Sequence, residues 1–350
     1  MFGTGLTRAL EAPVTTIFDQ IRANGSRVIG IDVPSGVNGD DGAVDQATLS
    51  AELTITFAAK KLGHVLMPGK AQCGHIAVVD IGIDAEIMET AGREALENGP
   101  DLWRRQFAVP HYSDHKYTRG HTLVYAGAQM TGAARLAAEN AARAGAGLVS
   151  LICTHDAAPV YRAALPPNII VHEDTGFTDS RVTARVIGPG GMPDSLSRLM
   201  SARPGAHCID VLDGDALTQD AQLDGNCVVT PHVGEFQRMF GDGEGAHKCE
   251  QARNAAARFG GVVVYNGADT VIADATRAVV NTKAPPRLAT AGAGDFLAGN
   301  IDVLAGQGMP VFEAACGGVW LHGAAANQYG AGLVADDIAD RLPAFLRELY

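Results

Sequence analysis

From His115 onward, the sequence alternates between short apolar runs and longer helix-like segments. Two apolar runs, at 123–126 and 148–152, are separated by an alanine-rich segment over about 132–144 that has the composition of a helix. Parallel strands need such a crossover, whereas antiparallel strands can be joined by a tight hairpin. The alternation therefore predicts an α/β fold with a mostly parallel sheet. The other predicted strands are 186–187, 208–212, 228–229, 261–265 and 270–273, and the other predicted helices are 295–308, 310–328 and 334–348.

Glycine-rich or polar turns follow the predicted strands in this half of the chain. The carboxyl ends of parallel strands meet at one edge of a sheet, so we expect these turns to face one crevice. The loop at 188–191 is either a ligand-binding loop or a bare turn before a helix. These turns are at Gly127, Gly188–Gly191, Asp213, His232 and Gly267, and the loop at 290–295 is expected to face the same crevice.

The stretch Leu288–Gly299 combines a glycine-rich turn with the start of an apolar helix. Gly292 and Gly294 allow the backbone to turn tightly and to approach a ligand without a Cβ in the way. The free N–H groups and the dipole at a helix N-terminus favour a phosphate. Asp295 lies at this junction, either as a general base beside a transferring phosphoryl group or as a plain N-cap.

The first part of the chain reads as three short strands, at 27–32, 53–57 and 76–80, followed by a helix and a linker over 86–115. We place a domain boundary near residue 105, which divides the chain into 1–105 and 106–350. Asp32 ends the first strand, where it either contacts a ligand or caps its own turn. The loop at 3–6 is a further candidate for backbone contact with a ligand, although no strand or helix precedes it.

Composition excludes several classes of partner. The net charge of −12 argues against nucleic acid and anionic membranes. No apolar run reaches the length of a membrane span, and the first 25 residues lack an apolar signal core. No two of the six cysteines are spaced as a CxxC pair, so we expect buried reduced thiols and a cytoplasmic protein.

Five blocks in the second half carry a family resemblance. They resemble the ribokinase-like family and, within it, the nicotinamide-nucleotide hydrate dehydratases. The Pro-His-x-Gly-Glu pattern at 231–235 is the most discriminating of them. The resemblance implies a ribokinase-like three-layer fold with a mostly parallel sheet over roughly 110–346. The blocks are 115–120, 131–147, 212–217, 230–235 and 288–299.

The resemblance implies a repair lyase that removes water from (6S)-hydrated NADH or NADPH. Hydroxide is a poor leaving group, so the hydroxyl is first phosphorylated from ADP or ATP, with release of phosphate and AMP or ADP. Asp295 would be the general base, and phosphoryl transfer implies Mg²⁺. Carried over by motif, the substrate-binding residues are Ala133, Gly190, His232 and Asp295. The nucleotide-binding residues carried over are Asn266, Gly267, Ala268, Asp269, Thr270 and Gly294.

The first 85 residues are similar to the second half of an epimerase domain that is often fused ahead of this dehydratase. Segments 2–8, 31–36 and 66–69 carry this match, which implies a partial Rossmann-like domain. Because the family's earlier half is absent, we expect no epimerase activity. In an intact domain, potassium would bind partly to Ser35, and substrate would contact Gly3, Thr4, Gly5, Leu6, Thr7, Arg8, Ala9 and Asp32.

Several positions keep alternatives open. His232 could be a helix cap rather than a ligand contact, and Ala133 could only pack its helix. The acidic side chains of Asp213, Asp215 and Glu235 are candidates for a place beside ligand, metal or bound water, and also ordinary turn or helix-start residues.

Asn266 stands where the family usually has Lys, which removes a positive charge near the nucleotide phosphates. The competing functions are therefore a small-molecule alcohol kinase of the same fold and a nucleotide-binding pseudoenzyme. A homo-oligomer is compatible with this class of protein.

Overall fold

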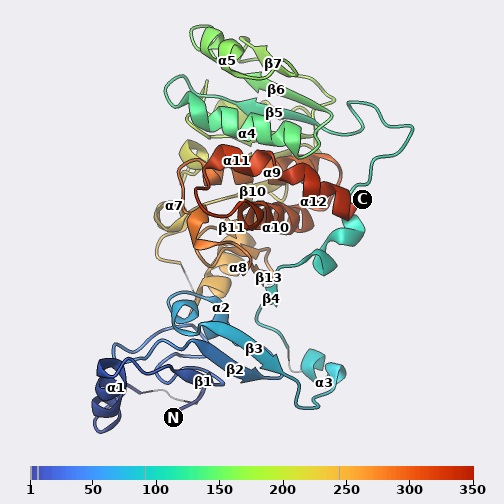
Figure 1. The fold of residues 1–350 in the computed structure, drawn as a ribbon. Coiled ribbons are helices and arrows are strands. Elements are labelled where there is room, and N and C mark those ends of the chain that lie inside the picture. The colour runs from blue at the N-terminus through green and yellow to red at the C-terminus, as the bar shows by residue number, and fades with distance from the viewer. Residues whose placement is uncertain (1, 6–7, 91, 244) are drawn as a thin grey trace. The chain divides into compact units, whose positions relative to one another are not determined.

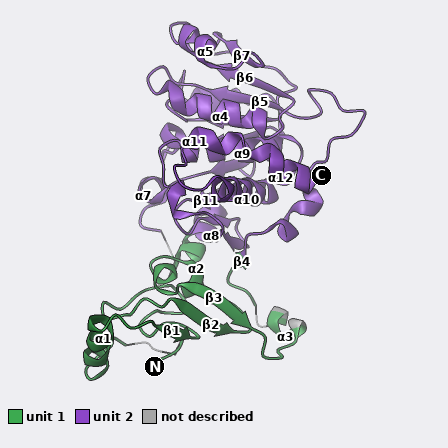
Figure 2. Cartoon of the chain, in the orientation of Figure 1, with its two compact units in different colours: residues 1–96, 245–251 green, residues 97–244, 252–350 purple. Residues whose placement is uncertain are grey.

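The computed structural model describes residues 2–5, 8–90, 92–243 and 245–350. The chain forms two compact units, Met1–Leu96 with Gly245–Gln251 and Glu97–Glu244 with Ala252–Tyr350 (Figure 2). The domain boundary near residue 105 stays a prediction.

The smaller unit contains a three-stranded parallel sheet in the order β1-β2-β3 (Figure 1). Its strands occupy the three segments predicted from the sequence. One apolar cluster, of Leu10, Phe18 and Leu49, holds the first helix against the unit. The elements are β1 (Ile29–Ile31), β2 (Leu53–Phe57), β3 (His75–Val79), α1 (Val14–Ala23), α2 (Leu62–Val65), η1 (Gly69–Gln72) and α3 (Ala85–Thr90).

The larger unit is built on a ten-stranded sheet in the order β4-β13-β12-β11-β10-β9-β8-β5-β6-β7. Strands β5 to β11 pair in parallel, while β12 is antiparallel to both β11 and β13. The predicted α/β fold is therefore confirmed. The strands are β4 (Leu96–Glu97), β5 (His121–Tyr125), β6 (Leu148–Ile152), β7 (Ile169–His172), β8 (Ala184–Ile187), β9 (Ile209–Leu212), β10 (Cys227–Val229), β11 (Val262–Tyr265), β12 (Val271–Ala273) and β13 (Ala278–Val280).

The strand order reverses between β5 and β8. From β5 the chain adds β6 and β7 on one side, and from β8 it adds β9, β10 and β11 on the other. In open α/β sheets, ligands bind outside the carboxyl ends of the strands at such a switch point. The turns after β5 and β8 are therefore where a site is expected.

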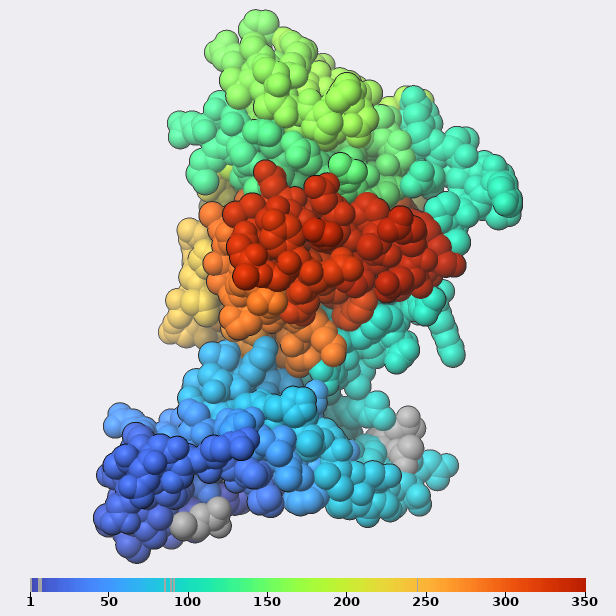
Figure 3. All heavy atoms as spheres, in the orientation of Figure 1, coloured from blue at the N-terminus to red at the C-terminus, as the bar shows by residue number. Residues whose placement is uncertain are grey.

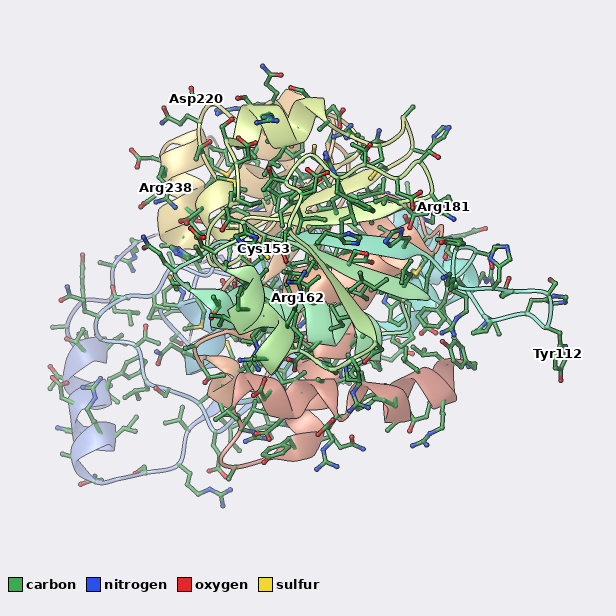
Figure 4. All side chains as sticks on the ribbon, turned by 90° about the horizontal axis from the view of Figure 1, so that it is seen from above. Tyr112, Cys153, Arg162, Arg181, Asp220 and Arg238 are labelled. Atoms are coloured by element: carbon green, nitrogen blue, oxygen red, sulfur yellow. The ribbon has the colours of Figure 1, made fainter. Side chains whose placement is uncertain are left out.

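Helices cover both faces of this sheet, with α9 to α12 on one face and α6 and α7 on the other (Figure 4). The last part of the chain, red in Figure 3, covers one face of the larger unit. A loop before β5 extends from this unit and carries the fully exposed Tyr112 at its tip (Figure 4). The helices are α4 (Thr131–Arg143), α5 (Ala158–Ala164), α6 (Leu196–Ser201), α7 (Val233–Phe240), α8 (Lys248–Phe259), α9 (Ala293–Gly306), α10 (Val311–Tyr329), α11 (Ala335–Ala339) and α12 (Leu342–Leu349), and the 3-10 turns are η2 (Pro100–Leu102), η3 (Arg104–Gln106), η4 (Gly214–Ala216) and η5 (Pro286–Leu288).

A buried ion pair joins the two central strands β8 and β9. The Arg185 guanidinium donates from Nε to Asp210 Oδ1 at 2.6 Å and from a terminal nitrogen to Oδ2 at 2.9 Å. Both side chains are fully buried, and Arg185 also donates to the carbonyl oxygen of Leu199 on α6. A buried bidentate pair of this kind is strongly directional, so it holds the register of the strands that carry the neighbouring turns.

Helix α9 packs against α4 and α10 and is buried from Phe296 to Ala305. Gly299 makes its contact with α4 very close, because a Cβ at this position would lie 2.5 Å from the carbonyl oxygen of Ala137. Asn140 on α4 strengthens the contact by donating to the carbonyl oxygen of Phe296 at 2.5 Å and to Asn300 Oδ1 at 2.9 Å. The position of α9 is thus set by backbone approach as well as by side chains.

We predict that Gly299→Ala destabilises the protein by roughly 1–3 kcal/mol, since the added methyl group forces α9 away from α4. Gly132→Ala is the matched control. It lies on α4, a Cβ there meets nothing within 4 Å, and helix propensity favours alanine by up to about 1 kcal/mol. Urea unfolding of the two variants measures the difference. Equal stability of both variants would show that the α4–α9 contact tolerates a methyl group.

Candidate active site

The turns after β5 and β8 touch each other at the switch point. A Cβ on Gly127 would lie 2.3 Å from the carbonyl oxygen of Gly190. Gly190 has a φ of +70°, and a Cβ there would lie 2.2 Å from the carbonyl oxygen of Met130 and 3.0 Å from Cβ of Ala133. The structure therefore brings together Ala133 and Gly190, two residues predicted to contact substrate, and leaves no room for side chains between them.

Tyr161 holds the turn after β5 and was not among the residues predicted from the sequence. Its hydroxyl donates to the carbonyl oxygen of Gly127 at 2.6 Å, and its side chain is fully buried. Tyr161 lies on α5, far from Gly127 in the chain, so only the folded arrangement reveals its role.

The glycine-rich stretch forms the N-terminus of α9, as predicted. The helix begins at Ala293, and its N-cap is Gly292 in the left-handed conformation, with a φ of +87°. Asp295 lies in the first turn and is half-buried. The alternative that Asp295 is a plain N-cap is therefore wrong, because glycine holds that position and leaves the carboxyl free of the capping role.

Asp213 lies directly beside this helix start. A Cβ on Gly188 would lie 1.8 Å from the Asp213 carbonyl oxygen, and a Cβ on Gly294 would lie 3.9 Å from Asp213 Oδ2. Thr230 donates from its hydroxyl to Asp213 Oδ1 at 2.8 Å. The ends of β8, β9 and β10 therefore meet the N-terminus of α9 at this carboxyl group.

Burial raises the pKa of both aspartates. Desolvation, helped by the negative charges of Asp295 and Glu235, raises the pKa of Asp213 to about 7 against the opposing hydrogen bond from Thr230. Desolvation and the charge of Glu235 raise the pKa of Asp295 to about 6. Carboxyl groups with such values exchange protons readily near neutral pH, which is typical of an active site.

His232 caps α7. Its Nδ1 accepts hydrogen bonds from the backbone N–H of Gly234 at 3.0 Å and of Glu235 at 3.4 Å, and Glu235 Oε2 accepts from the His232 backbone N–H at 2.9 Å. These bonds require Nδ1 to be an acceptor, so the neutral ring carries its proton on Nε2. The side chain is 67% exposed and its Nε2 lies 3.5 Å from Glu235 Oε1, so a ligand that accepts from Nε2–H would compete with this carboxylate.

The loop after β11 is tied to the loop after β10. Asn266 donates from its side-chain amide to the carbonyl oxygen of Thr230 at 2.7 Å and from its backbone N–H to Pro231 at 2.8 Å. Thr270 donates to the carbonyl oxygen of Gly267 at 2.9 Å, which closes the turn. Gly267 and Ala268 are exposed, whereas Asp269 and Thr270 are buried. The predicted nucleotide-binding segment is thus a closed turn with an exposed tip.

In the smaller unit, Asp32 adopts a left-handed conformation with a φ of +65°. Its carboxylate accepts from Thr56 at 2.9 Å and from Lys61 at 2.6 Å, so the alternative that it caps its own turn is wrong. Burial works to raise the pKa of Asp32, but the hydrogen bonds from Lys61 and Thr56 outweigh it and lower the pKa below its usual value.

The smaller unit also contains Ser35 and the residues near the N-terminus that were predicted to bind potassium and substrate. The Ser35 hydroxyl accepts from the backbone N–H of Phe2 at 2.8 Å and donates to its carbonyl oxygen at 3.1 Å, so potassium binding there stays a prediction. Leu6 and Thr7 lie outside the described residues. The exposed members of the predicted set are Gly3, Thr4, Gly5, Arg8 and Ala9.

The structure also bears on the expectations for metal binding, for the cysteines and for membrane spans. Within the described residues, no group of three or more His, Cys, Asp or Glu side chains is arranged to hold a metal ion. All six cysteines are buried and none forms a disulfide, as predicted. Of the helices in the described parts of the chain, none combines the length and apolar character needed to cross a membrane.

Comparison with known proteins points to one family. A family model described as NAD(P)H-hydrate dehydratase matches residues 122–343, and one described as YjeF-related protein N-terminus matches residues 1–63. The bifunctional NAD(P)H-hydrate repair enzyme of Coxiella burnetii is 31% identical over 98% of this chain and 74% of that protein. The enzyme of the same name from Escherichia coli is 32% identical over 98% of this chain and 70% of that protein.

Solved structures agree with this match. The ADP/ATP-dependent NAD(P)H-hydrate dehydratase of Bacillus subtilis, co-crystallised with ATP and Mg²⁺, is 26% identical with a TM-score of 0.61, over 73% of this chain and 99% of that one. A ribokinase-like superfamily protein of Enterococcus faecalis shares the fold, with 22% identity and a TM-score of 0.64 over 73% of this chain and 97% of that one.

We predict that His232→Ala destabilises the protein by about 1 kcal/mol, because α7 loses its cap. His232→Asn is the matched control, since the asparagine side-chain oxygen can accept the same two backbone N–H bonds. Thermal or urea unfolding measures both variants, and His232→Asn should stay close to the unsubstituted protein. If both variants lose the same stability, the capping bonds are not what His232 contributes.

Proposed function

This chain belongs to the NAD(P)H-hydrate dehydratase family, and from that premise we propose that residues 106–350 form a domain that restores (6S)-hydrated NADH or NADPH at the expense of an adenine nucleotide. The observation that carries the proposal is the meeting of the switch-point turns, the glycine-rich start of α9 and two carboxyl groups with raised pKa values. The cysteines are buried and form no disulfide, which suits action in a reducing cytoplasm.

Asp295 is the proposed general base. It takes the proton of the ring hydroxyl while that oxygen attacks the terminal phosphorus of the nucleotide. A pKa of about 6 leaves most of this carboxyl ionised at neutral pH and keeps it a better base than an ordinary aspartate. The amides of 291–294 at the N-terminus of α9 would stabilise the charge on the phosphoryl group during transfer.

The proposed substrate contacts are of two kinds. Gly190 and Ala133 would approach the dinucleotide through the backbone, which their tight packing supports. His232 would donate from Nε2–H, because its Nδ1 is engaged by α7. His232→Asn, which keeps the cap, therefore separates a loss of substrate affinity from a loss of stability.

The nucleotide is proposed to bind at the loop after β11, through residues 266–270, and at Gly294. Mg²⁺ would arrive with the nucleotide phosphates. The described residues contain no preformed metal cage, and Mg²⁺ on phosphates usually keeps several water ligands. The ion would supply charge neutralisation on the phosphates, while the proton transfers belong to the side chains of this chain.

The test of the proposed function is to mix the protein with hydrated NADH, MgADP or MgATP, and to follow the absorbance of reduced nicotinamide. A nucleotide-dependent rise is expected, and the rates identify the preferred nucleotide. A small-molecule kinase would instead leave a stable phosphorylated product, and a nucleotide-binding pseudoenzyme would leave the hydrate unchanged. Either result would contradict the proposal.

We predict that Asp295→Asn lowers kcat by roughly 10²–10⁴-fold while nucleotide binding persists, since the amide cannot accept the hydroxyl proton. The activity of the unsubstituted protein should fall as the pH drops through about 6, where Asp295 becomes protonated. Asp220→Asn is the control, because it removes an exposed carboxylate of the same unit (Figure 4). Near-normal turnover of Asp295→Asn would exclude Asp295 as the base.

We predict that Asn266→Lys tightens ADP binding about fivefold, corresponding to roughly 1 kcal/mol for a solvent-accessible charge contact. The gain should shrink as salt rises, because the contact is electrostatic. Titration calorimetry measures the affinity. Asn266→Met matches lysine in length without its charge, and a gain of the same size in that variant would rule out the electrostatic explanation.

A further inference from the structure

The dehydration involves two protons, and Asp295 accounts for one of them. Removing water from the hydrated ring takes the hydroxyl from one carbon and a hydrogen from the carbon beside it. Asp295 takes the hydroxyl proton before phosphoryl transfer under the proposed function, on which this inference rests. The proton on the neighbouring carbon still needs an acceptor when the ring double bond forms again.

Asp213 is placed to be that acceptor. It follows β9 near the middle of the sheet and is buried, with 7% of its surface exposed. Its Oδ1 is held by the Thr230 hydroxyl at 2.8 Å, whereas its Oδ2 lies on the side of Gly294, 3.9 Å from where a Cβ would stand. One oxygen of the carboxyl group is therefore fixed, and the other faces the start of α9.

The charges around Asp213 argue against a purely structural role. The charged groups that act on it come from α9, through Asp295, and from α7, through Glu235, and both are acidic. Asp215 lies on the following turn, with its Oδ2 3.8 Å from the Cβ position of Gly191. A buried carboxyl group among other acids is costly to keep ionised, unlike the paired Asp210. The same acidic surroundings favour a positively charged ligand.

Such a ligand forms in this reaction. When phosphate leaves, it takes the electrons of the C–O bond, and the lone pair of the ring nitrogen forms a double bond to the same carbon, which leaves the ring cationic. Loss of the proton from the neighbouring carbon then supplies the electrons of the restored C=C bond, and the nitrogen regains its lone pair. The carboxylates of Asp213 and Glu235 would stabilise that cation.

We propose that Asp213 is a second catalytic base, which accepts the proton from the ring carbon beside the hydroxyl-bearing carbon after phosphate has left. The two carboxyl groups then act in order. Asp295 becomes neutral when it takes the hydroxyl proton, and its charge no longer opposes the ionisation of Asp213. The first proton transfer thereby prepares the acceptor for the second.

The decisive variant is Asp213→Asn, which keeps the size of the side chain and its ability to accept from Thr230. We expect NADH formation to fall by about 10²-fold or more, while hydrate-dependent consumption of nucleotide continues. Phosphorus NMR would then record phosphorylated hydrate or released phosphate without matching NADH. Asp295→Asn should instead stop both readouts together, because it acts before phosphoryl transfer.

A deuterium label gives an independent readout. Hydrate prepared in heavy water carries deuterium on the carbon beside the hydroxyl-bearing carbon. The isotope effect on NADH formation should increase in Asp213→Asn, where loss of this hydrogen becomes the slowest step. An unchanged isotope effect, near-normal NADH formation, or a parallel loss of nucleotide consumption and NADH in a folded variant would each overturn the role of Asp213.

Thr230→Val keeps the proposal testable if Asp213→Asn fails to fold. The hydrogen bond from Thr230 lowers the pKa of Asp213, so its loss should raise that pKa and, as the pH falls, lower NADH formation relative to nucleotide consumption, whereas protonation of Asp295 lowers both together. An unchanged ratio of NADH formed to nucleotide consumed would overturn the proposal. If the unsubstituted protein forms no NADH with either nucleotide, the proposed function itself fails, which is a distinct result from any failure of Asp213.

Discussion

The close packing of α9 against α4 is the contact on which the site depends. The Ala137 carbonyl oxygen lies where a side chain of Gly299 would be, and a Cβ on Gly292 would lie 2.4 Å from Leu136 Cδ1. Two glycines on α9 and its cap therefore let the whole helix approach α4, while Asn140 fixes the contact by hydrogen bonds. Because the same helix begins with the glycine-rich loop and Asp295, its approach to α4 sets where the Asp295 carboxyl group lies.

The buried acids give this site its chemistry. An exposed aspartate is fully ionised at neutral pH and is a weak base, whereas desolvation raises the pKa of Asp295 to about 6 and of Asp213 to about 7. The fold buries Asp213 and half-buries Asp295 by placing them where the ends of β8, β9 and β10 meet α9. A reaction that removes one proton from oxygen and one from carbon can use two bases of this kind, provided that each carboxyl group lies beside the substrate proton that it accepts.

Much of this arrangement could be predicted from the sequence. The alternation of strands and helices predicted a parallel α/β sheet, and the turns after its strands were predicted to share one crevice. Strands β7 and β13 were not predicted, because each is a short apolar run without a distinctive period, and β13 is held by antiparallel pairing. The alternatives in which Asp295 or Asp32 acts only as a cap were wrong. Gly292 is the N-cap of α9, and the Asp32 carboxylate accepts from Thr56 and Lys61, which lie outside its own turn.

The sequence by itself determined the class of fold, the family and the turns that carry polar chemistry, because periodicity and local turn preferences act over a few residues. Only the tertiary structure decided which atoms meet. Gly190 meets Ala133, Thr230 holds one oxygen of Asp213, and the other oxygen faces Gly294, although these residues are far apart in the chain. The raised pKa values are also tertiary properties, because desolvation depends on everything packed around a carboxyl group rather than on its neighbours in the sequence.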